Sequence, residues 1–569
     1  MRKPQLLVAA LVLLAATSSL VYAKVVEYEW VVDYAWAAPD CVEKQVISIN
    51  GEFPGPNIRS VAGDTVRVHV INRMPTEAVV IHWHGMLQTG TPWEDGAAYV
   101  SQCPIDPEDE YTYDFVTENA GTYFWHGHYG MQRAAGFYGQ LIVDPPENFT
   151  EPFKYDGEHS IVLNDWWHAS MIDQQLGLFS VPFRWVGEPQ SLLIEGRGRY
   201  NCSLMAGGSA CNATRESCKL HVMPVEAGKT YRLRIASVAS LGSFNFILEG
   251  HNFTVVEADG HYVEPVTMSD IDVYSGESYS VLFTANADCS RNYWAGFNVR
   301  GRDPKTLTGL AVLQYVNTSG EPSTPAPVSP RWNDYAYSVA KARQYLARKE
   351  FIVPLPQRGP DRQIFLLNTQ NRVNGRLKWA LNNVSFVPTA TPALAALKYN
   401  ITVEAHGGHS SATPPDYFQE GYDIMKPPPY PETVQGSGVY ELKGDQVVDI
   451  ILQNACSLTA NVSEVHPWHL HGHDFWILGY GDGVFNASKD YASLNYYNPP
   501  LRNTAPLFPF GWTVLRFVTD NPGVWPFHCH IESHFHMGMG VIFAESVDKL
   551  PDVPTDTMGC GATKFYRSP

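Results

Sequence analysis

Basic residues are in short supply in this chain. Its 569 residues contain 40 Lys and Arg against 58 Asp and Glu, which gives a formal net charge of −18 at pH 7. Phosphate groups would be repelled by such a surface, so binding to DNA or RNA is excluded as a main function. The overall charge does not steer an anionic small molecule either, so any such substrate has to be recognised by local groups.

Long apolar runs are also missing. The longest, residues 6–16, is shorter than the roughly 20 residues that a membrane-spanning helix needs. It follows Arg2 and Lys3 and leads to a small-residue stretch that ends at Ala23, which is the pattern of a secretory signal peptide. We therefore predict a signal peptide over residues 1–23, cleavage after Ala23, secretion and no membrane association. The polar C-terminal tail gives no sign of a lipid anchor.

Two further features agree with secretion. The chain has nine cysteines, and disulfides form readily on the secretory route. It also has nine N-x-S/T sequons, whose asparagines are Asn148, Asn201, Asn212, Asn252, Asn317, Asn383, Asn400, Asn461 and Asn486.

Long helical patterns are absent, and short alternating runs take their place. With 45 Gly and 41 Pro the chain turns often, and runs such as residues 65–70, 230–235 and 446–452 alternate as strands of β-sandwiches do. Similar Gly-containing starts at Ala62, Ala227 and Lys443 introduce these runs, which suggests a repeated domain. The length predicts three or four domains. A Pro- and Ser-rich stretch over residues 320–330 indicates a surface linker.

Histidine is scarce too, with 20 in the whole chain, yet 12 of them fall in four short stretches. Each stretch contains a His-x-His pair, which places two imidazoles on one face of a strand. A single pair is weak evidence for a metal, because a lone buried histidine usually has a structural role. Four such stretches in one chain predict metal binding. The pairs are His82 and His84, His126 and His128, His469 and His471, and His528 and His530.

Cys529 stands between the last two imidazoles. If this segment begins as a strand, the thiol of Cys529 faces one way while His528 and His530 face the other. One short segment would then touch two metal sites. His534 and Met539 follow closely, and a thiolate with two imidazoles and a distant thioether defines a blue-copper site. The second imidazole is expected from residues 466–473.

The four stretches are far apart in sequence. Two lie near the N-terminus and two near the C-terminus, while the middle of the chain has no His-x-His pair. A shared site therefore has to form where the first and third domains meet, with the second domain acting as a spacer.

The histidine stretches and their flanking residues resemble the copper-binding motifs of multicopper oxidases, and within that family the ascorbate oxidase branch of plants. The resemblance runs from about residue 27 to residue 563 and includes "HWHGMLQTGTPWEDG", "GTYFWHGHYGMQRAAGFYGQLIVDPP", "VLNDWWHAS", "HPWHLHGHDFWILGYGDG" and "NPGVWPFHCHIESHFHMGMGVIFAE". It implies an all-β fold of three cupredoxin-like Greek-key β-sandwich domains. We place these at residues 24–150, 151–345 and 346–569, after the signal peptide.

The resemblance also implies four copper ions and their ligands. The type 1 copper would be held by His466, Cys529, His534 and Met539. The type 2 copper would be held by His82 and His469. The type 3 pair would be held by His84, His126, His128, His471, His528 and His530. His473 and His536 match no ligand position and are expected to be structural.

Several other residues take roles from the resemblance. Asp95 matches an acidic residue that helps to deliver protons near the cluster, and Asp474 could orient an imidazole of the ligand run. Trp185, Trp379 and His534 match the substrate pocket, where the reductant is expected to approach an exposed edge of His534 or His466. The pair Trp166–Trp167 is read as core.

The same resemblance pairs the cysteines as Cys41 with Cys218, Cys103 with Cys560 and Cys202 with Cys211. Cys289 and Cys456 are left over, and buried free thiols are the simpler interpretation.

The resulting hypothesis is a secreted enzyme of the apoplast or cell wall that oxidises L-ascorbate in one-electron steps and reduces O2 to two waters. Cys529, His528, His530 and Asp95 would be its catalytic residues. A laccase-type phenol oxidase is the alternative, and a copper-free cell-wall glycoprotein of the same fold is a third reading. A homodimer is implied by the resemblance alone.

Overall fold

The computed structural model describes residues 23–205, 210–303, 305–401, 412–418, 422–427 and 433–566. The predicted signal peptide, apart from its last residue, lies outside the described residues. Strands dominate the described part of the chain, and its longest helix has nine residues. The expected all-β fold is confirmed. The five α-helices of the described part are α1 (Met171–Phe179), α2 (Tyr335–Ala342), α3 (Ala393–Lys398), α4 (Ala487–Asp490) and α5 (Glu532–His536).

The first domain is a sandwich of two four-stranded sheets. One sheet has the order β2-β1-β4-β6 and the other the order β3-β8-β7-β5. Their strands are β1 (Val25–Ala37), β2 (Lys44–Ile49), β3 (Ile58–Val61), β4 (Thr65–Asn72), β5 (Ile81–His84), β6 (Glu110–Val116), β7 (Gly121–Gly127) and β8 (Tyr138–Asp144).

The second domain pairs a six-stranded sheet with a five-stranded one. Their orders are β10-β9-β12-β17-β14-β15 and β11-β19-β18-β13-β16. The strands are β9 (Gly157–Trp166), β10 (Ser191–Ile194), β11 (Val222–Val225), β12 (Thr230–Ser237), β13 (Ser243–Leu248), β14 (Phe253–Ala258), β15 (His261–Met268), β16 (Asp270–Val273), β17 (Ser278–Thr284), β18 (Tyr293–Arg300) and β19 (Gly309–Tyr315).

The third domain has sheets of eight and five strands. Their orders are β23-β22-β21-β20-β25-β30-β27-β28 and β24-β32-β31-β26-β29. The strands are β20 (Arg362–Val373), β21 (Arg376–Leu381), β22 (Val384–Phe386), β23 (Val434–Gly436), β24 (Val439–Leu442), β25 (Val447–Asn454), β26 (His466–Leu470), β27 (Phe475–Asp482), β28 (Leu501–Arg502), β29 (Thr504–Leu507), β30 (Gly511–Val518), β31 (Gly523–Cys529) and β32 (Gly540–Glu545).

Alternation of side chains explains how these sheets build their cores. In β4 every second residue is buried, so Val66, Val68 and Val70 face the sandwich interior while the residues between them are partly exposed. The run at residues 65–70 was one of those predicted as a strand. The pair Trp166–Trp167 is fully buried, which confirms its interpretation as core.

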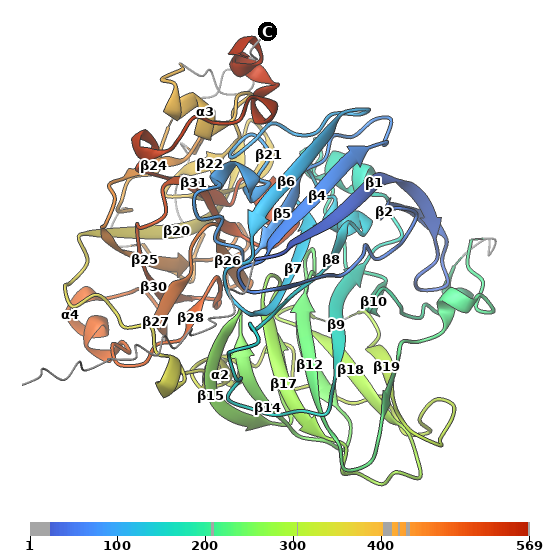
Figure 1. The fold of residues 1–569 in the computed structure, drawn as a ribbon. Coiled ribbons are helices and arrows are strands. Elements are labelled where there is room, and N and C mark those ends of the chain that lie inside the picture. The colour runs from blue at the N-terminus through green and yellow to red at the C-terminus, as the bar shows by residue number, and fades with distance from the viewer. Residues whose placement is uncertain are drawn as a thin grey trace, which may run out of the picture.

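The two ends of the chain meet across the first and third domains. The blue N-terminal sheets lie beside the orange and red C-terminal ones, and the green second domain lies below both (Figure 1). A disulfide between Cys103 and Cys560 joins the first domain to the C-terminal segment. The amide of Asn521 also donates to the carbonyl of Leu87, 2.7 Å away.

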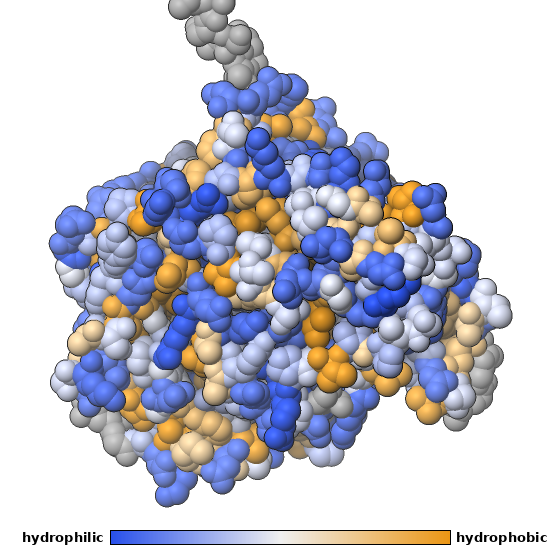
Figure 2. All heavy atoms as spheres, turned by 90° about the horizontal axis from the view of Figure 1, so that it is seen from below, coloured by the Kyte–Doolittle hydropathy of each residue, from blue (hydrophilic) through white to orange (hydrophobic). Residues whose placement is uncertain are grey.

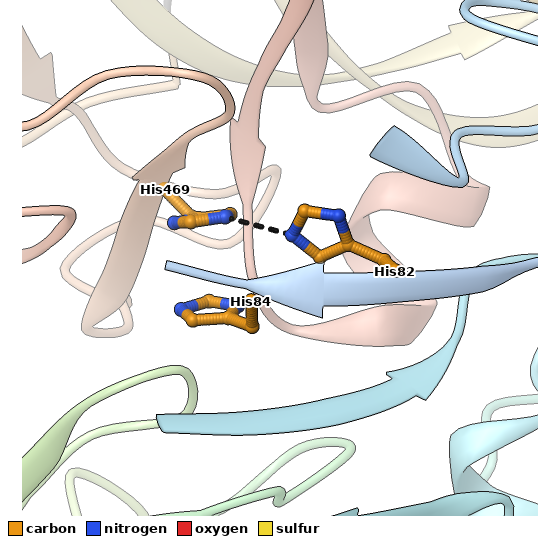
Figure 3. A group of neighbouring side chains, drawn as sticks. All are labelled: His82, His84 and His469. Atoms are coloured by element: carbon orange, nitrogen blue, oxygen red, sulfur yellow. Dashed lines mark hydrogen bonds between the residues drawn. The ribbon is translucent and has the colours of Figure 1, made fainter. Parts of the chain in front are cut away.

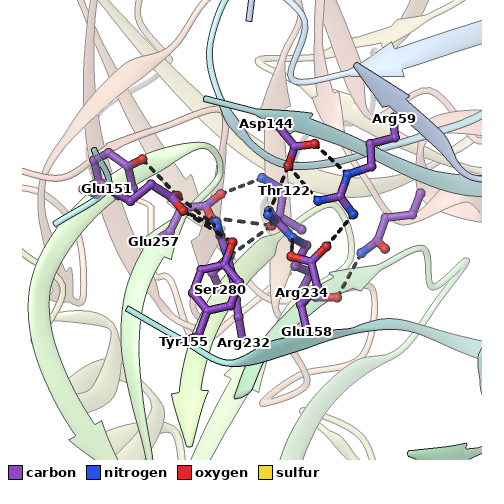
Figure 4. Close-up of polar contacts among 12 residues, drawn as sticks. Arg59, Thr122, Asp144, Glu151, Tyr155, Glu158, Arg232, Arg234, Glu257 and Ser280 are labelled. Carbon is purple, nitrogen blue, oxygen red and sulfur yellow. Dashed lines mark hydrogen bonds and ion pairs between the residues drawn. The ribbon is translucent and has the colours of Figure 1, made fainter. Parts of the chain in front are cut away.

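Buried ion pairs connect the first domain to the second. Figure 4 shows Arg59 bound to Asp144 and Glu158, with Arg232 and Arg234 below it. Arg232 pairs with Glu257 at 2.6 Å, and both side chains are almost fully buried. Because Glu257 also accepts a hydrogen bond from the backbone N–H of Thr122 in β7, this second-domain carboxylate binds the first domain directly.

The structure contains three disulfides, and they are the three pairs that the resemblance implies: Cys41–Cys218, Cys103–Cys560 and Cys202–Cys211. Cys456 is free and buried. Cys289 is free but exposed, so the expectation of burial is wrong there. The reason is its position in a turn between β17 and β18, outside the sandwich core.

Within the described part of the chain, every helix is too short or too polar to span a bilayer. The lower face of the molecule in Figure 1 is dominated by hydrophilic side chains, with hydrophobic ones gathered in small patches (Figure 2).

Candidate metal centre

Cross-strand pairing brings the first histidines together. In the β5–β7 ladder His82 lies opposite His126, so both imidazoles project from the same face of the sheet. In the third domain β26 pairs with β31, and His469 lies opposite His528. Figure 3 shows His82 and His84 of the first domain facing His469 of the third. The predicted meeting of the two domains at a shared histidine site is therefore present in the structure.

Only the first His-x-His pair lies entirely within a strand. His128, His471 and His530 each follow the end of β7, β26 or β31. Their rings still reach the same centre as those of their partners.

Eight imidazoles form what we call the histidine cluster. Within it, three sets of three residues have nitrogen atoms within 4.8 Å of one another, and His84 belongs to two of them. These sets are His82 with His84 and His469, His84 with His126 and His530, and His128 with His471 and His528.

Hydrogen bonds to carbonyl oxygens fix the tautomers of several cluster histidines. The Nδ1 atom of His82 donates to the backbone oxygen of Asp95 at 2.8 Å, and Nδ1 of His469 donates to the backbone oxygen of Asn503 at 2.8 Å. His126 and His528 donate in the same way to neighbouring carbonyls. Each of these rings therefore presents an unprotonated Nε2 atom to the centre of the cluster.

The unprotonated nitrogens face one another at close range. The Nε2 atoms of His82 and His469 are 3.2 Å apart, and those of His128 and His528 are 3.3 Å apart. Two lone pairs at this distance repel each other unless a cation lies between them. His84 adds a buried Nδ1 atom with no hydrogen-bond partner. This donor set fits soft or borderline metal ions such as copper, for which imidazole is a preferred ligand.

Burial keeps the cluster histidines neutral. Loss of solvent lowers the pKa of His528 to about 3, and it lowers the pKa values of His84, His126 and His469 well below their usual range. Because a metal ligand has to be unprotonated, these imidazoles are ready for metal at neutral pH.

A second group of ligand-type atoms surrounds Cys529. The Sγ atom of Cys529 lies 3.7 Å from Nδ1 of His466 and 3.9 Å from Nδ1 of His534, and these two nitrogens are 3.2 Å apart. All three residues are buried. Burial raises the pKa of the Cys529 thiol, so a thiolate at this position requires a cation beside it.

Met539 is held next to this group by the backbone. Its carbonyl accepts from the N–H of Cys529 at 3.1 Å, and its own N–H donates to the carbonyl of His534 at 3.0 Å. The side chain is fully buried. Both bonds place the residue at the position expected of a weak fourth ligand.

Two tryptophans and a charged pair lie around His534. The ring of Trp379 is 4.9 Å from the ring of His534, and that of Trp185 is 6.1 Å away. Glu464 approaches Nε2 of His534 at 3.3 Å and pairs with Arg302, which lies over Trp185. The sequence pattern missed Glu464 and Arg302. The one signal in the sequence for Glu464 is its position two residues before His466, and Arg302 has no such signal.

The expectation that an edge of His534 or His466 is exposed is wrong. Their exposed fractions are 1% and 0%, because Trp379, Glu464 and Arg302 pack around them. Trp185 is half-buried and is the part of this site nearest to solvent.

The acidic residues near the cluster have distinct partners. The carboxylate of Asp95 lies 2.9 Å from Nδ1 of His471, while its backbone oxygen binds His82. Asp474 instead pairs with His261 of the second domain at 2.8 Å, so the expectation that it orients a ligand imidazole is wrong. His473 lies 3.0 Å from Glu545, and its Nδ1 is 3.3 Å from the backbone oxygen of His471.

A cavity of about 480 Å³ reaches the histidine cluster. Its walls include His126, His128, His528 and His530. Its walls also include Cys529 but not Trp185 or Trp379, so the tryptophan site is not part of this cavity.

Three family models of multicopper oxidases match this chain, over residues 31–148, 157–318 and 409–549. Together they account for most of its length. This chain belongs to the multicopper oxidase family. Its three sandwiches are the cupredoxin-like domains of that family, and the two groups of ligand-type residues fit the copper ions that the family implies.

Curated relatives place this multicopper oxidase more finely. It is 52% identical over 554 residues to the L-ascorbate oxidase of Cucumis sativus, which covers 96% of this chain and 93% of that protein. It is 51% identical over 560 residues to the L-ascorbate oxidase of Nicotiana tabacum, with 97% and 95% covered. Laccase-12 of Arabidopsis thaliana is 33% identical over 550 residues, with 93% of each protein covered.

Solved structures agree on the fold of this multicopper oxidase. The laccase of Botrytis aclada superposes with a TM-score of 0.75 at 26% identity, covering 94% of this chain and 90% of that one. Fet3p, described as a multicopper oxidase that functions in iron import, has a TM-score of 0.75 at 24% identity, with 94% of each chain covered.

Proposed function

We propose that this chain is a secreted L-ascorbate oxidase that takes electrons singly from ascorbate and reduces O2 to two waters. Support for the substrate comes from the relatives, because identity to L-ascorbate oxidases is 50–52% and identity to laccases is 32–33%. The chemistry itself is supported by the two groups of ligand-type side chains.

One observation carries the proposal. Cys529 projects its sulfur into the group with His466 and His534, while its sequence neighbours His528 and His530 reach into the histidine cluster. A few covalent bonds therefore connect the two groups. This is the shortest path that the chain offers for electrons moving from one group to the other.

Four copper ions would occupy these groups and supply the one-electron redox chemistry. We assign the type 1 site to His466, Cys529, His534 and Met539. We assign the type 2 site to His82 and His469, and the type 3 pair to His84, His126, His128, His471, His528 and His530. The grouping of His128 with His471 and His528, and of His84 with His126 and His530, supports two separate positions within that pair.

The chain's own residues orient these ligands and provide a proton acceptor. Asp95 binds His471 through its carboxylate and His82 through its carbonyl oxygen. Burial raises the pKa of its carboxyl group, which brings it closer to the range in which it can accept and return protons. We therefore assign Asp95 to proton delivery at the histidine cluster.

The donor site is assigned to Trp185, Trp379 and His534. A planar lactone ring can pack against an indole, and the buried Nε1 of Trp379 has no hydrogen-bond partner among the described residues. Arg302 lies over Trp185, and it supplies a local positive charge beside Glu188 and Glu464. Both carboxylates pair with Arg302, so the three side chains together carry one net negative charge and do not by themselves attract an anionic substrate.

The alternative of a phenol oxidase is decided by substrate preference. Oxygen uptake should be compared for ascorbate and catechol, each at a series of concentrations, with the copper-loaded enzyme. We expect kcat/KM to be higher for ascorbate. A clear preference for catechol would assign the chain to the laccase type instead. A protein that stays colourless after copper loading would support the third reading, a copper-free glycoprotein.

Three further points belong to the proposal. Domain boundaries near residues 150 and 345 fall between the last strand of one sandwich and the first of the next. Secretion to the apoplast or cell wall rests on the N-terminal pattern and on the sequons, of which all but Asn383 are exposed. A homodimer rests on the family resemblance.

A further inference from the structure

The cavity beside the histidine cluster has an unpaired positive charge in its wall. Lys378 lines this cavity and is only 6% exposed. Within the described part of the chain its ammonium group forms no hydrogen bond and no ion pair. Its one recorded contact is with the ring of Phe179 in α1, whose centroid lies 4.4 Å from Nζ.

A buried ammonium group normally has a partner. It carries three N–H donors and a full charge, and burying these without an acceptor is costly. Lys378 has no such acceptor among the described residues and opens onto the cavity; its burial lowers the pKa to about 8, and no nearby carboxylate restores it. The two carboxylates that line the same cavity, Glu77 and Glu532, form no ion pair with it. Both oxygens of Glu532 instead accept from the backbone N–H groups of Arg133 and Ala134.

His536 packs against the same aromatic ring. The centroids of His536 and Phe179 are 4.7 Å apart, and His536 also lines the cavity. Its Nε2 atom is buried and has no hydrogen-bond partner. An Nε2–H tautomer would supply one more donor next to the ammonium group.

The two elements that hold these residues also build the donor site. In β21 Lys378 and Trp379 are consecutive, so their side chains point to opposite faces of the strand. In α5 His534 and His536 are two residues apart and also point in different directions. His534 points towards Cys529, and His536 points towards the cavity. Lys378 and His536 therefore lie on the cavity side of the elements that separate the cavity from the tryptophan site.

We propose that Lys378 and His536 form a binding site for a small monovalent inorganic anion, such as a halide, in the wall of this cavity. One unmatched positive charge selects a single negative charge. Both residues line the cavity of about 480 Å³, which admits such an ion. The site is separate from the two groups of ligand atoms assigned to copper.

A consequence follows if the proposed oxidase function holds. The anion would occupy the cavity that leads to His126, His128, His528 and His530, and not the tryptophan site. It should therefore slow the use of O2 without competing with ascorbate.

The site is tested most directly with bromide, whose anomalous scattering identifies it in a crystal. Crystals of the copper-loaded enzyme should be soaked in sodium bromide for the wild type, Lys378→Met and Lys443→Met. Lys443 is exposed, and among the described residues its side chain forms no hydrogen bond or ion pair. Lys443→Met is therefore a control that removes the same single charge elsewhere. We expect a bromide peak against Nζ of Lys378 in the wild type and in Lys443→Met, and none in Lys378→Met.

The proposal is overturned if the wild type shows no bromide at Lys378, whatever binds elsewhere, or if Lys378→Met keeps the same peak. The wild-type crystal alone decides this if the variant does not fold. In solution, bromide should inhibit Lys378→Met at least about tenfold more weakly than Lys443→Met, since a charged donor is lost. Equal inhibition of both variants would also reject the site. The crystal result is independent of turnover, so it separates failure of this site from failure of the proposed function.

Discussion

Asp95 shows how one residue connects imidazoles from opposite ends of the chain. It follows the first histidine pair in sequence and lies in the short 3-10 helix Pro92–Asp95. Its carboxylate holds His471 of the third domain, and its carbonyl oxygen holds His82 of the first. Both bonds fix the ring nitrogen that does not point into the cluster, and so they determine which nitrogen is free for metal.

Replacing Asp95 with asparagine tests this orientation. In Asp95→Asn the backbone contact to His82 remains, but the carboxylate bound to Nδ1 of His471 is lost. We expect metal affinity or turnover to fall by about 10- to 100-fold, the usual effect of removing a group that orients a metal ligand. Copper retention against a chelator and oxygen uptake would measure it. Asp552→Asn, at an exposed position, is the control and should behave like the wild type.

Cys529→Ser tests the link between the two groups. A serine hydroxyl is a poor ligand for copper and has no thiolate charge transfer, so we expect the blue colour and ascorbate turnover to disappear. The fold should persist, because the three sandwich cores do not depend on this side chain. Cys289→Ser removes the exposed free thiol and should change neither property. A Cys529→Ser enzyme that oxidised ascorbate at the wild-type rate would contradict the assigned path.

At the level of single residues, the sequence identifies the ligand-type side chains more readily than it identifies the residues that surround them. The histidine pairs and Cys529 could be found because rare residue types recur at the same His-x-His spacing in four short stretches. Glu464 and Arg302 could not, because one carboxylate and one guanidinium in a chain with many charges carry no pattern. Burial of His534 was missed for the same reason, since it depends on those two side chains.

Among the elements, the strands of the first and second domains are joined by buried charges. Glu257 of β14 binds Arg232 of β12 and the backbone of Thr122 in β7. Burial alone would raise the pKa of Glu257, but the nearby Arg232 and Arg234 and its hydrogen bonds outweigh this, so the pKa lies below its usual range. The carboxylate therefore contributes stability above its unfolded pKa of about 4.3, and this contribution is lost as the pH falls through the lower folded value.

Glu257→Gln should expose this contribution. At pH 7 we expect the variant to be destabilised by about 3 kcal/mol, because Arg232 loses a buried partner. The difference from the wild type should shrink as the pH is lowered below about 4.3, where the wild-type carboxylate also begins to lose its charge. Denaturant unfolding at several pH values would measure both. Glu27→Gln, at an exposed ion pair with Arg67, should change stability by less than about 1 kcal/mol.

Prediction from sequence succeeded for elements where periodicity is the signal. The runs at residues 65–70, 230–235 and 446–452 correspond to β4, β12 and β25. The contacts between domains were not predictable in this way. They depend on which polar side chains meet across an interface, and alternation within one strand contains no information about its partner in another domain.

For the whole molecule, the copper-binding regions require the first and third domains to stay together. The Cys103–Cys560 disulfide spans 457 residues of sequence and ties the C-terminal segment to the first domain. Long loops lose the most entropy when they are closed, so this bridge restricts the unfolded chain strongly. The resemblance indicated that the two ends of the chain would meet, and the disulfide is one of the contacts that joins them.

A double variant, Cys103→Ser with Cys560→Ser, should lower the free energy of unfolding by about 2–5 kcal/mol. Because the interface that contains the histidine cluster would separate more easily, copper should also be lost faster to a chelator. Thermal unfolding and copper release would be followed together. The variant pair Cys202→Ser and Cys211→Ser, which opens a loop of only 9 residues, is the control and should have a smaller effect on copper release. Equal rates of copper release in both pairs would contradict this role.

The central claim is that ten imidazoles, one thiol and one thioether hold four copper ions that work together. The most direct measurement is the copper content of the fully loaded, purified protein, taken together with ascorbate-dependent oxygen uptake. We predict four copper ions per chain, a blue colour, and oxygen uptake that is unchanged by added catalase because no peroxide is released. Far fewer than four copper ions per chain, or no oxygen uptake with ascorbate, would contradict the account.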